Sequence, residues 1–231
     1  MSMMVETGRI WFTEWYSRQE GQGDCRNITD KQLEQFARFK KNLLEWNNRM
    51  NLTAITDDED VWQKHFADSL TLLPFLPAPS ERPLRLIDVG CGAGFPGLPI
   101  KIMRPDISMT MLDSLRKRIF FLEDTISRLG FTDIECIHAR AEDFVKENGR
   151  GRQYDICTSR AVARLNKLCK WCLPFVKNGG VFLAMKGPDT AVELEEALPV
   201  ISKLGSEVKE VRLVEILPGM RHSIIVIKRY E

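Results

Sequence analysis

The chain has 231 residues, of which 44% are hydrophobic and 28% charged, and its formal net charge is +1. This length is enough for one large domain, or one domain with a small extension, around a substantial core. The near-zero charge excludes a globally basic surface, so RNA or DNA would have to bind through a local patch. No apolar run approaches the length of a membrane span, and the N-terminus lacks the pattern of a signal peptide. We therefore expect a cytoplasmic protein with no membrane partner.

The first 80 residues predict helices. Thr29 with Gln32 forms a capping-box pattern, and an apolar stripe at three- and four-residue steps follows as far as Met50. A second helix is expected after the acidic run TDDED, because carboxylates suit a helix N-terminus. The proline-rich stretch 74–83 is typical of a linker. We predict a helical N-terminal extension over residues 1–80 and a ligand-binding domain over residues 81–231.

After the linker, short strand-like runs alternate with helix-length segments. The runs are LRLIDV, SMTMLD, DIECIHA, YDICTS and GVFLAM. Such alternation predicts an α/β fold with a mostly parallel, Rossmann-like sheet covered on both faces. Two further runs, joined at Pro218 and Gly219, predict an antiparallel pair at one edge, with an antiparallel C-terminal edge strand. In such sheets the ligand binds past the carboxyl ends of the strands, so the residues that close each strand are the site candidates.

The loop after the first strand reads in two ways. From Gly92 it gives G-x-G-x-x-G, a weak dinucleotide signal, and from Asp88 to Gly94 it gives D-x-G-x-G-x-G, a pattern of S-adenosylmethionine sites. Glycines let a ligand approach the backbone, which makes Gly90, Gly92 and Gly94 candidate contacts. Prolines 96 and 99 remove two N–H donors that a pyrophosphate would use. Asp88 offers an acceptor to a cationic ligand, so the loop favours S-adenosyl-L-methionine over NAD.

Acidic residues close the next two strands. Asp113 is a candidate acceptor for a ribose hydroxyl, which both ligands carry, and capping the following helix is its alternative role. In ARAEDF, the N–H of Ala141 and the carboxylate of Glu142 or Asp143 could read an adenine, although two acids also suit a helix N-terminus.

At the end of the fourth strand stand Ser159 and Arg160. Arginine stays protonated and cannot act as a base, so the target should need no deprotonation there, as for a ring nitrogen such as guanine N7. Arg160 and Lys186 are candidate anion clamps for a carboxylate or an RNA phosphate. Arg221 and His222 lie where they could also meet a phosphate backbone. A role for Arg160 as an ordinary surface residue stays open.

Two other groups of residues are weaker candidates for a functional site. His65, Asp68 and Ser69 share one helical face, but residues within one turn do not line up as a hydrolytic triad, so we expect His65 to line a pocket or pack between helices. Only Cys169 and Cys172 form a C-x-x-C, without the further ligands that zinc needs. We expect packed, reduced thiols and no metal. The six cysteines are at positions 25, 91, 136, 157, 169 and 172.

The chain resembles the bacterial glucose-inhibited division protein B family, methyltransferases of guanine N7 in small-subunit (16S) ribosomal RNA. The matching runs are WNNRMNLTAI, HFADSL, IDVGCGAGFPGLPI, MLDS, ARAEDF, SRAVARL, MKG and RHSIIVIK, from about Trp46 to Lys228. The resemblance implies a class I methyltransferase fold, S-adenosylmethionine as cofactor, and 16S ribosomal RNA or a small-subunit particle as partner. It also implies that Gly90, Phe95, Ala141, Glu142 and Arg160 contact the cofactor. Residues 1–28 match nothing in the family, and the oligomeric state stays open.

Three alternatives remain at this point. A methyltransferase acting on another base, a small molecule or a protein would share the cofactor. An NAD-dependent dehydrogenase would share the glycine loop, and a non-catalytic RNA-binding module would bind no cofactor.

Overall fold

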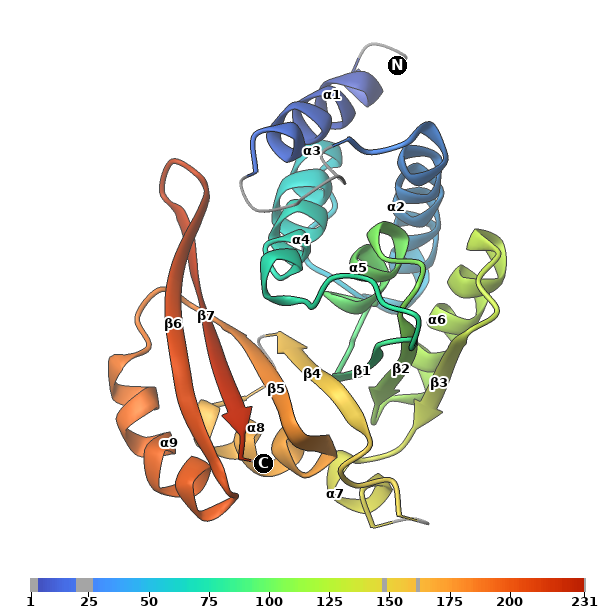
Figure 1. Cartoon of the computed structure of the whole chain (residues 1–231). Coiled ribbons are helices and arrows are strands. Elements are labelled where there is room, and N and C mark those ends of the chain that lie inside the picture. The colour runs from blue at the N-terminus through green and yellow to red at the C-terminus, as the bar shows by residue number, and fades with distance from the viewer. Residues whose placement is uncertain (1–3, 20–26, 147–148, 161–162, 231) are drawn as a thin grey trace.

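The computed structural model describes residues 4–19, 27–146, 149–160 and 163–230, and a seven-stranded sheet runs through it (Figure 1). The sheet order is β3-β2-β1-β4-β5-β7-β6. Strands β1 to β5 are parallel, and β7 is antiparallel to both β5 and β6. The predicted mostly parallel sheet with an antiparallel edge pair is confirmed. The outermost strand is β6, because the last strand inserts between it and β5. The strands are β1 (Arg85–Val89), β2 (Ser108–Asp113), β3 (Ile134–His138), β4 (Tyr154–Arg160), β5 (Val176–Lys186), β6 (Ser206–Leu217) and β7 (Met220–Arg229).

Helices cover both faces of the sheet. On one face, α5 and α6 carry a hydrophobic cluster that continues into the N-terminal helices, and on the other face α7, α8 and α9 cover a second cluster. The helices of the sheet region are α5 (Gly97–Met103), α6 (Arg116–Leu129), α7 (Ala141–Phe144), α8 (Leu165–Cys172), the 3₁₀ turn η3 (Leu173–Phe175) and α9 (Ala191–Lys203). Of the described helices, none has the length and apolar character needed to cross a membrane.

The N-terminal part is helical, as predicted. Its elements are α1 (Met4–Ser17), α2 (Asp30–Met50), α3 (Asp58–Asp60), the π-helix η1 (Val61–Ala67), α4 (Asp68–Leu70) and the 3₁₀ turn η2 (Leu73–Phe75). Helix α2 begins after the predicted capping box, since Thr29 Oγ1 accepts from the Gln32 N–H and Gln32 Oε1 accepts from the Thr29 N–H. The expected second helix is present, but its middle is wound as a π-helix, for which the sequence carries no signal.

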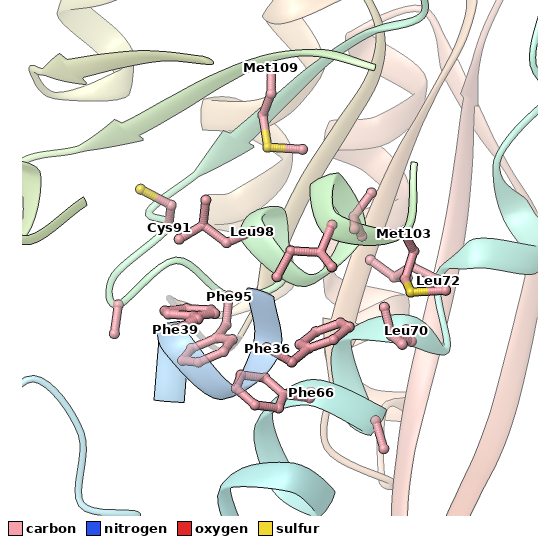
Figure 2. Close-up of a cluster of buried hydrophobic side chains, with 14 of the residues drawn as sticks. Phe36, Phe39, Phe66, Leu70, Leu72, Cys91, Phe95, Leu98, Met103 and Met109 are labelled. Carbon is pink, nitrogen blue, oxygen red and sulfur yellow. The ribbon is translucent and has the colours of Figure 1, made fainter. Parts of the chain in front are cut away.

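An aromatic cluster joins the helical part to the sheet part. Phe36 and Phe39 of α2 pack with Phe66 of η1, and Phe39 also packs with Phe95, which follows the glycine loop (Figure 2). All four side chains are buried. Residues 77–84, close to the predicted boundary at residue 80, form no helix or strand. One hydrophobic cluster nevertheless contains residues from both sides of this segment, so the N-terminal helices hold the glycine loop in place from behind.

Candidate cofactor and substrate site

The glycine loop adopts a backbone conformation that residues other than glycine rarely adopt. Gly90 and Gly92 have φ values of 71° and 58°, in the left-handed region. The N–H groups of Gly90 and Cys91 donate to the Leu112 carbonyl at the end of β2, and the Gly92 N–H donates to Asp113 Oδ2 at 2.9 Å. The backbone of the loop is thus tied to the end of the neighbouring strand β2.

Asp113 organises this corner of the site. Its Oδ1 accepts from the Leu115 N–H at 2.9 Å, and Arg118 Nη1 lies 3.1 Å from Oδ2. The side chain is almost completely buried. Asp113 therefore holds the chain just ahead of α6 and also fixes Gly92, while its predicted contact with a ribose hydroxyl stays a prediction.

Three cavities follow the carboxyl edge of the sheet in strand order. The first, the β2–β3 cavity, has a volume of about 420 Å³. It is lined by Val89, Gly90, Leu112, Asp113, Ser114, Leu115, Arg118, Ala139, Arg140, Ala141, Glu142, Lys167 and Trp171. Four predicted site residues, Gly90, Asp113, Ala141 and Glu142, come together here. As the first residue of α7, Ala141 has an N–H without an acceptor inside the helix.

The second, the glycine-loop cavity, has a volume of about 310 Å³ and shares Gly90 and Arg118 with the first. It is lined by Leu52, Thr53, His65, Gly90, Cys91, Gly92, Ala93, Phe95, Arg118 and Arg160. Phe95 forms its floor, with Phe39 behind it, and the His65 ring stacks on Phe95 with centroids 4.3 Å apart. The Arg160 guanidinium lies 4.9 Å from the Phe95 ring centroid, a cation–π arrangement.

The third, the β4–β5 cavity, has a volume of about 320 Å³ and shares His65 and Arg160 with the second. It is lined by Ile55, Lys64, His65, Asp68, Arg160, Met185, Lys186, Gly187 and His222. The Lys186 ammonium, a predicted anion clamp, already lies 2.8 Å from Glu193 Oε2 and donates to the Ala163 carbonyl. In this structure Lys186 thus has a carboxylate partner of its own.

Arg160 links the last two cavities through a network with Asp68 and His65. Its Nη1 lies 2.8 Å from Asp68 Oδ2, and its Nη2 donates to His65 Nδ1 at 3.1 Å. Burial, helped by the charge of Arg160, lowers the pKa of His65 to about 3, so the imidazole is neutral. Its Nε2 then donates to Thr53 Oγ1 at 2.9 Å. His65 lines a pocket, as predicted, and its only basic nitrogen is occupied.

Asp88 and Gly94 lie elsewhere than expected. Asp88 is completely buried beneath the loop, outside the residues that line the three cavities, and its Oδ2 accepts from the Gly97 N–H at 2.9 Å. Burial raises the pKa of Asp88 to about 7. Gly94 faces Leu98 and Leu122 in the core. We expected both residues to contact the ligand directly because of their positions in the D-x-G-x-G-x-G motif. In the fold, these residues fix the start of α5 and the back of the loop.

Several lining residues were missed by sequence reasoning. Arg118 is not among the predicted site residues, yet it borders both the β2–β3 and the glycine-loop cavity. Trp171 of α8 donates from Nε1 to Glu142 Oε1, and Lys167 lies over the Trp171 ring. The helical spacing in the sequence indicates that Lys167 and Trp171 share one face of α8. Only the packing of α8 beside α7 shows that this face lines the β2–β3 cavity.

The remaining sequence candidates give no second site. Ser69 is buried and donates to the His65 carbonyl, so it cannot act with His65 as a nucleophile. Cys169 and Cys172 are buried in α8, and burial raises the pKa of Cys169 to about 12. Among the described residues, no three His, Cys, Asp or Glu side chains gather as metal ligands. Cys25, together with Ala161 and Val162 of the SRAVARL run, lies outside the described residues.

The residues present fit S-adenosylmethionine. A loop with positive φ at Gly90 and Gly92 leaves its backbone open to a ligand, and Asp113 with Glu142 supplies acceptors in the cavity beside it.

The fold of the chain is shared by proteins of known structure. Among solved structures, the chain is similar to precorrin-6y C5,15-methyltransferase from Geobacter metallireducens GS-15, with a TM-score of 0.52 and 15% identity over 78% of this chain and 92% of that one. It is also similar to M. jannaschii TYW2 in complex with AdoMet, with a TM-score of 0.52 and 16% identity over 64% and 69% of the two chains.

The fold is the Rossmann-like fold of these structures, and the family match makes the protein an S-adenosylmethionine-dependent methyltransferase of this class. The sequence narrows this class further. The chain belongs to the GidB family, rRNA small subunit methyltransferase G, whose model matches residues 32–223. A relative from Alkaliphilus oremlandii, named ribosomal RNA small subunit methyltransferase G, is 46% identical over 213 residues, which is 92% of this chain and 88% of that protein. Family membership excludes the dehydrogenase and the non-catalytic alternatives.

Proposed function

We propose that the protein transfers a methyl group from S-adenosylmethionine to N7 of a guanine in 16S ribosomal RNA, in the bacterial cytoplasm. The curated relatives are named for methylation of small-subunit ribosomal RNA. The observation that supports N7 is that neither of the two described residues shared by the glycine-loop and β4–β5 cavities, His65 and Arg160, is a free base. Arg160 cannot take a proton, and His65 Nδ1 already accepts from Arg160. A ring nitrogen with a free lone pair needs no such base.

The reaction then depends on alignment. S-adenosylmethionine supplies an activated methyl group on a sulfonium, and displacement by the N7 lone pair forms the N–C bond as the C–S bond breaks, with no proton transferred. Asp113 and Glu142 supply acceptors for the adenosine end, and Arg160 supplies a cation for a carboxylate at the glycine-loop cavity. Orientation alone can contribute roughly 7–11 kcal/mol to such a step in favourable cases.

The experiment that tests this function supplies labelled S-adenosylmethionine with either protein-free 16S ribosomal RNA or small-subunit particles. Nuclease mapping then locates the label. We expect one guanine to carry it at N7, in at least one of the two substrates. Label on another base, on protein or on neither RNA form would contradict the proposal.

The proposed role of Arg160 is tested in the same assay. Arg160→Ala should weaken binding of S-adenosylhomocysteine or RNA, because it removes the cation shared by the two cavities. Arg164→Ala is the matched control, since Arg164 is exposed and pairs with Glu196. If both affinities of Arg160→Ala equal those of the wild type, the clamp role is wrong.

A further inference from the structure

The three cavities lie side by side, and the proposed position of the cofactor occupies only two of them, which leaves the β4–β5 cavity free. Their linings follow the sheet from β3 and β2, through the loop after β1, to the ends of β4 and β5. Neighbouring cavities share residues, Gly90 and Arg118 at the first boundary and His65 and Arg160 at the second. A cofactor held by its adenosine at Asp113 and by its methionine end at the glycine loop fills the first two. The β4–β5 cavity is then the neighbour of the methyl group.

We infer that the β4–β5 cavity receives the target guanine and that the Asp68 carboxylate reads its Watson–Crick edge. This inference rests on the proposed function, because it names the binding site for the base that the reaction requires. Enzymes that modify a base in RNA or DNA commonly extrude it into a pocket, hold it against apolar side chains and hydrogen-bond its Watson–Crick edge. Ile55 and Met185 supply apolar walls here.

Asp68 has the chemistry for guanine. Guanine presents two adjacent donors, N1–H and the 2-amino group, on the edge opposite N7, and a carboxylate accepts both. Asp68 lines only the β4–β5 cavity, whereas Arg160 and His65 line its boundary with the glycine-loop cavity. A guanine whose N1 edge faces Asp68 can therefore direct N7 toward that boundary.

The carboxylate is held in place and kept ionised. Arg160 Nη1 lies 2.8 Å from Oδ2, and His222 Nδ1 lies 2.9 Å from Oδ1. Burial alone would raise the pKa of Asp68, but the hydrogen bond from His222 and the charge of Arg160 outweigh it, so the pKa lies below its usual value. A carboxylate has about four lone-pair sites, and these two donors leave the others for a ligand.

The first experiment blocks the cavity without touching the cofactor contacts. A Cβ at Gly187 would have no atom within 4 Å, and the backbone there is not left-handed, so Gly187→Phe adds a ring without strain at a residue that lines the β4–β5 cavity. We expect methyl transfer to fall by at least about 10-fold, while the affinity for S-adenosylhomocysteine stays within a factor of about two. Asp189→Phe is the control, because it adds the same ring at an exposed position of the same loop outside the cavity.

The second experiment identifies the contact, and its first arm uses only the wild-type protein. The mapped guanine is replaced by inosine, which keeps N7 and N1–H and lacks the 2-amino group. Wild-type transfer to the inosine RNA should fall by about 10- to 100-fold. Asp68→Asn, which retains the shape of the side chain, should methylate guanine RNA less well and should lose far less on going to inosine. A purely structural Asp68 would show the same inosine effect in both proteins.

The outcomes separate the two proposals. If the wild-type protein methylates no guanine in ribosomal RNA, the proposed function fails. If it does so but Gly187→Phe with normal thermal stability is equally active, the cavity is not the base site. If wild-type transfer is indifferent to inosine, Asp68 does not read the 2-amino group, and the inference is wrong on that point.

Discussion

Asp113 makes more contacts than a ribose acceptor alone requires. Its carboxylate accepts from two backbone N–H groups, of Gly92 and Leu115, and pairs with Arg118. A single residue thus couples the shape of the glycine loop, the start of α6 and the lining of two cavities. Residues at the ends of strands are effective in this way because each touches the loops that follow two neighbouring strands.

We predict that Asp113→Ala weakens binding of S-adenosylhomocysteine by about 10- to 100-fold, since hydrogen bonds to a charged group contribute about 1.5–3 kcal/mol. Isothermal titration calorimetry measures this. Asp143→Ala is the control, because Asp143 is exposed on α7 and outside the cavity lining. Equal affinities for the two variants would show that Asp113 does not contribute to the cofactor site.

His65 and Asp88 respond to pH in opposite directions. Burial lowers the pKa of His65 from 6.5 to about 3 and raises that of Asp88 from 3.8 to about 7. The stability that His65 contributes is present above pH 6.5 and is lost as the pH falls toward 3. The stability that Asp88 contributes is present below pH 3.8 and is lost as the pH rises through 7. In the window between, the two contributions largely offset each other.

Substituting either residue should therefore leave the pH-dependent contribution of the other to stability without its opposing contribution. Relative to wild type, the free energy of unfolding of His65→Asn should fall as the pH rises from about 4 to 6.5, by up to about 1.4 kcal/mol per pH unit. Asp88→Asn should show the reverse slope over the same window. Denaturant titrations at several pH values measure both. Parallel profiles for the wild type and both variants would contradict the assignment.

At the scale of elements, helix α1 docks through a glycine. Gly8 is buried against Trp62 of η1, and a Cβ at this position would lie 2.5 Å from Trp62 Cδ1. In an isolated helix, alanine would be better than glycine by about 1 kcal/mol. Here the close approach of α1 to η1 reverses that preference.

We predict that Gly8→Ala destabilises the docking of α1, by about 1–3 kcal/mol for overpacking. Hydrogen exchange of the amides from Arg9 to Tyr16 should accelerate, while that of β1 to β5 changes little. Arg9→Ala, at the exposed neighbouring position, serves as the control. Slower exchange in Gly8→Ala would mean that helix propensity outweighs the contact with Trp62.

At the scale of the whole molecule, the helical part and the sheet part share one hydrophobic cluster. Phe39 packs on Phe95, and Trp46 packs on Phe121 of α6. Trp46 Nε1 and Asn42 also donate to Asp124 of α6. The N-terminal helices α1, α2, η1 and α4 therefore supply one wall of the core on this face of the sheet.

We predict that residues 81–231 expressed alone do not fold, because they would expose Phe95, Phe121 and their neighbours to water. For the full chain we expect a single cooperative thermal transition, shifted upward as a whole by S-adenosylhomocysteine. Calorimetry measures both. Two separate transitions, or a stable isolated sheet region, would show that the extension is energetically independent.

The sequence predicts the sheet well because its signals are local. The alternation of strands and helices, the capping box at Thr29 and the glycine loop each lie within a few neighbouring residues. The site is less predictable because it is assembled at long range. Arg160 meets Asp68 across 92 positions, and the contact of Trp171 with Glu142 depends on how α8 packs beside α7. The burial of Asp88 likewise follows from the way α5 folds back over β1, which the loop motif alone does not reveal.

Trp171 gives the molecule a built-in optical reporter. The chain has five tryptophans, and four of them lie in α1, α2 and η1, outside the lining of the β2–β3 and glycine-loop cavities. An adenine seated beside the remaining indole should quench its emission, so occupancy can be followed by intrinsic fluorescence without any label. Trp171→Phe should silence that signal while calorimetry still detects the ligand.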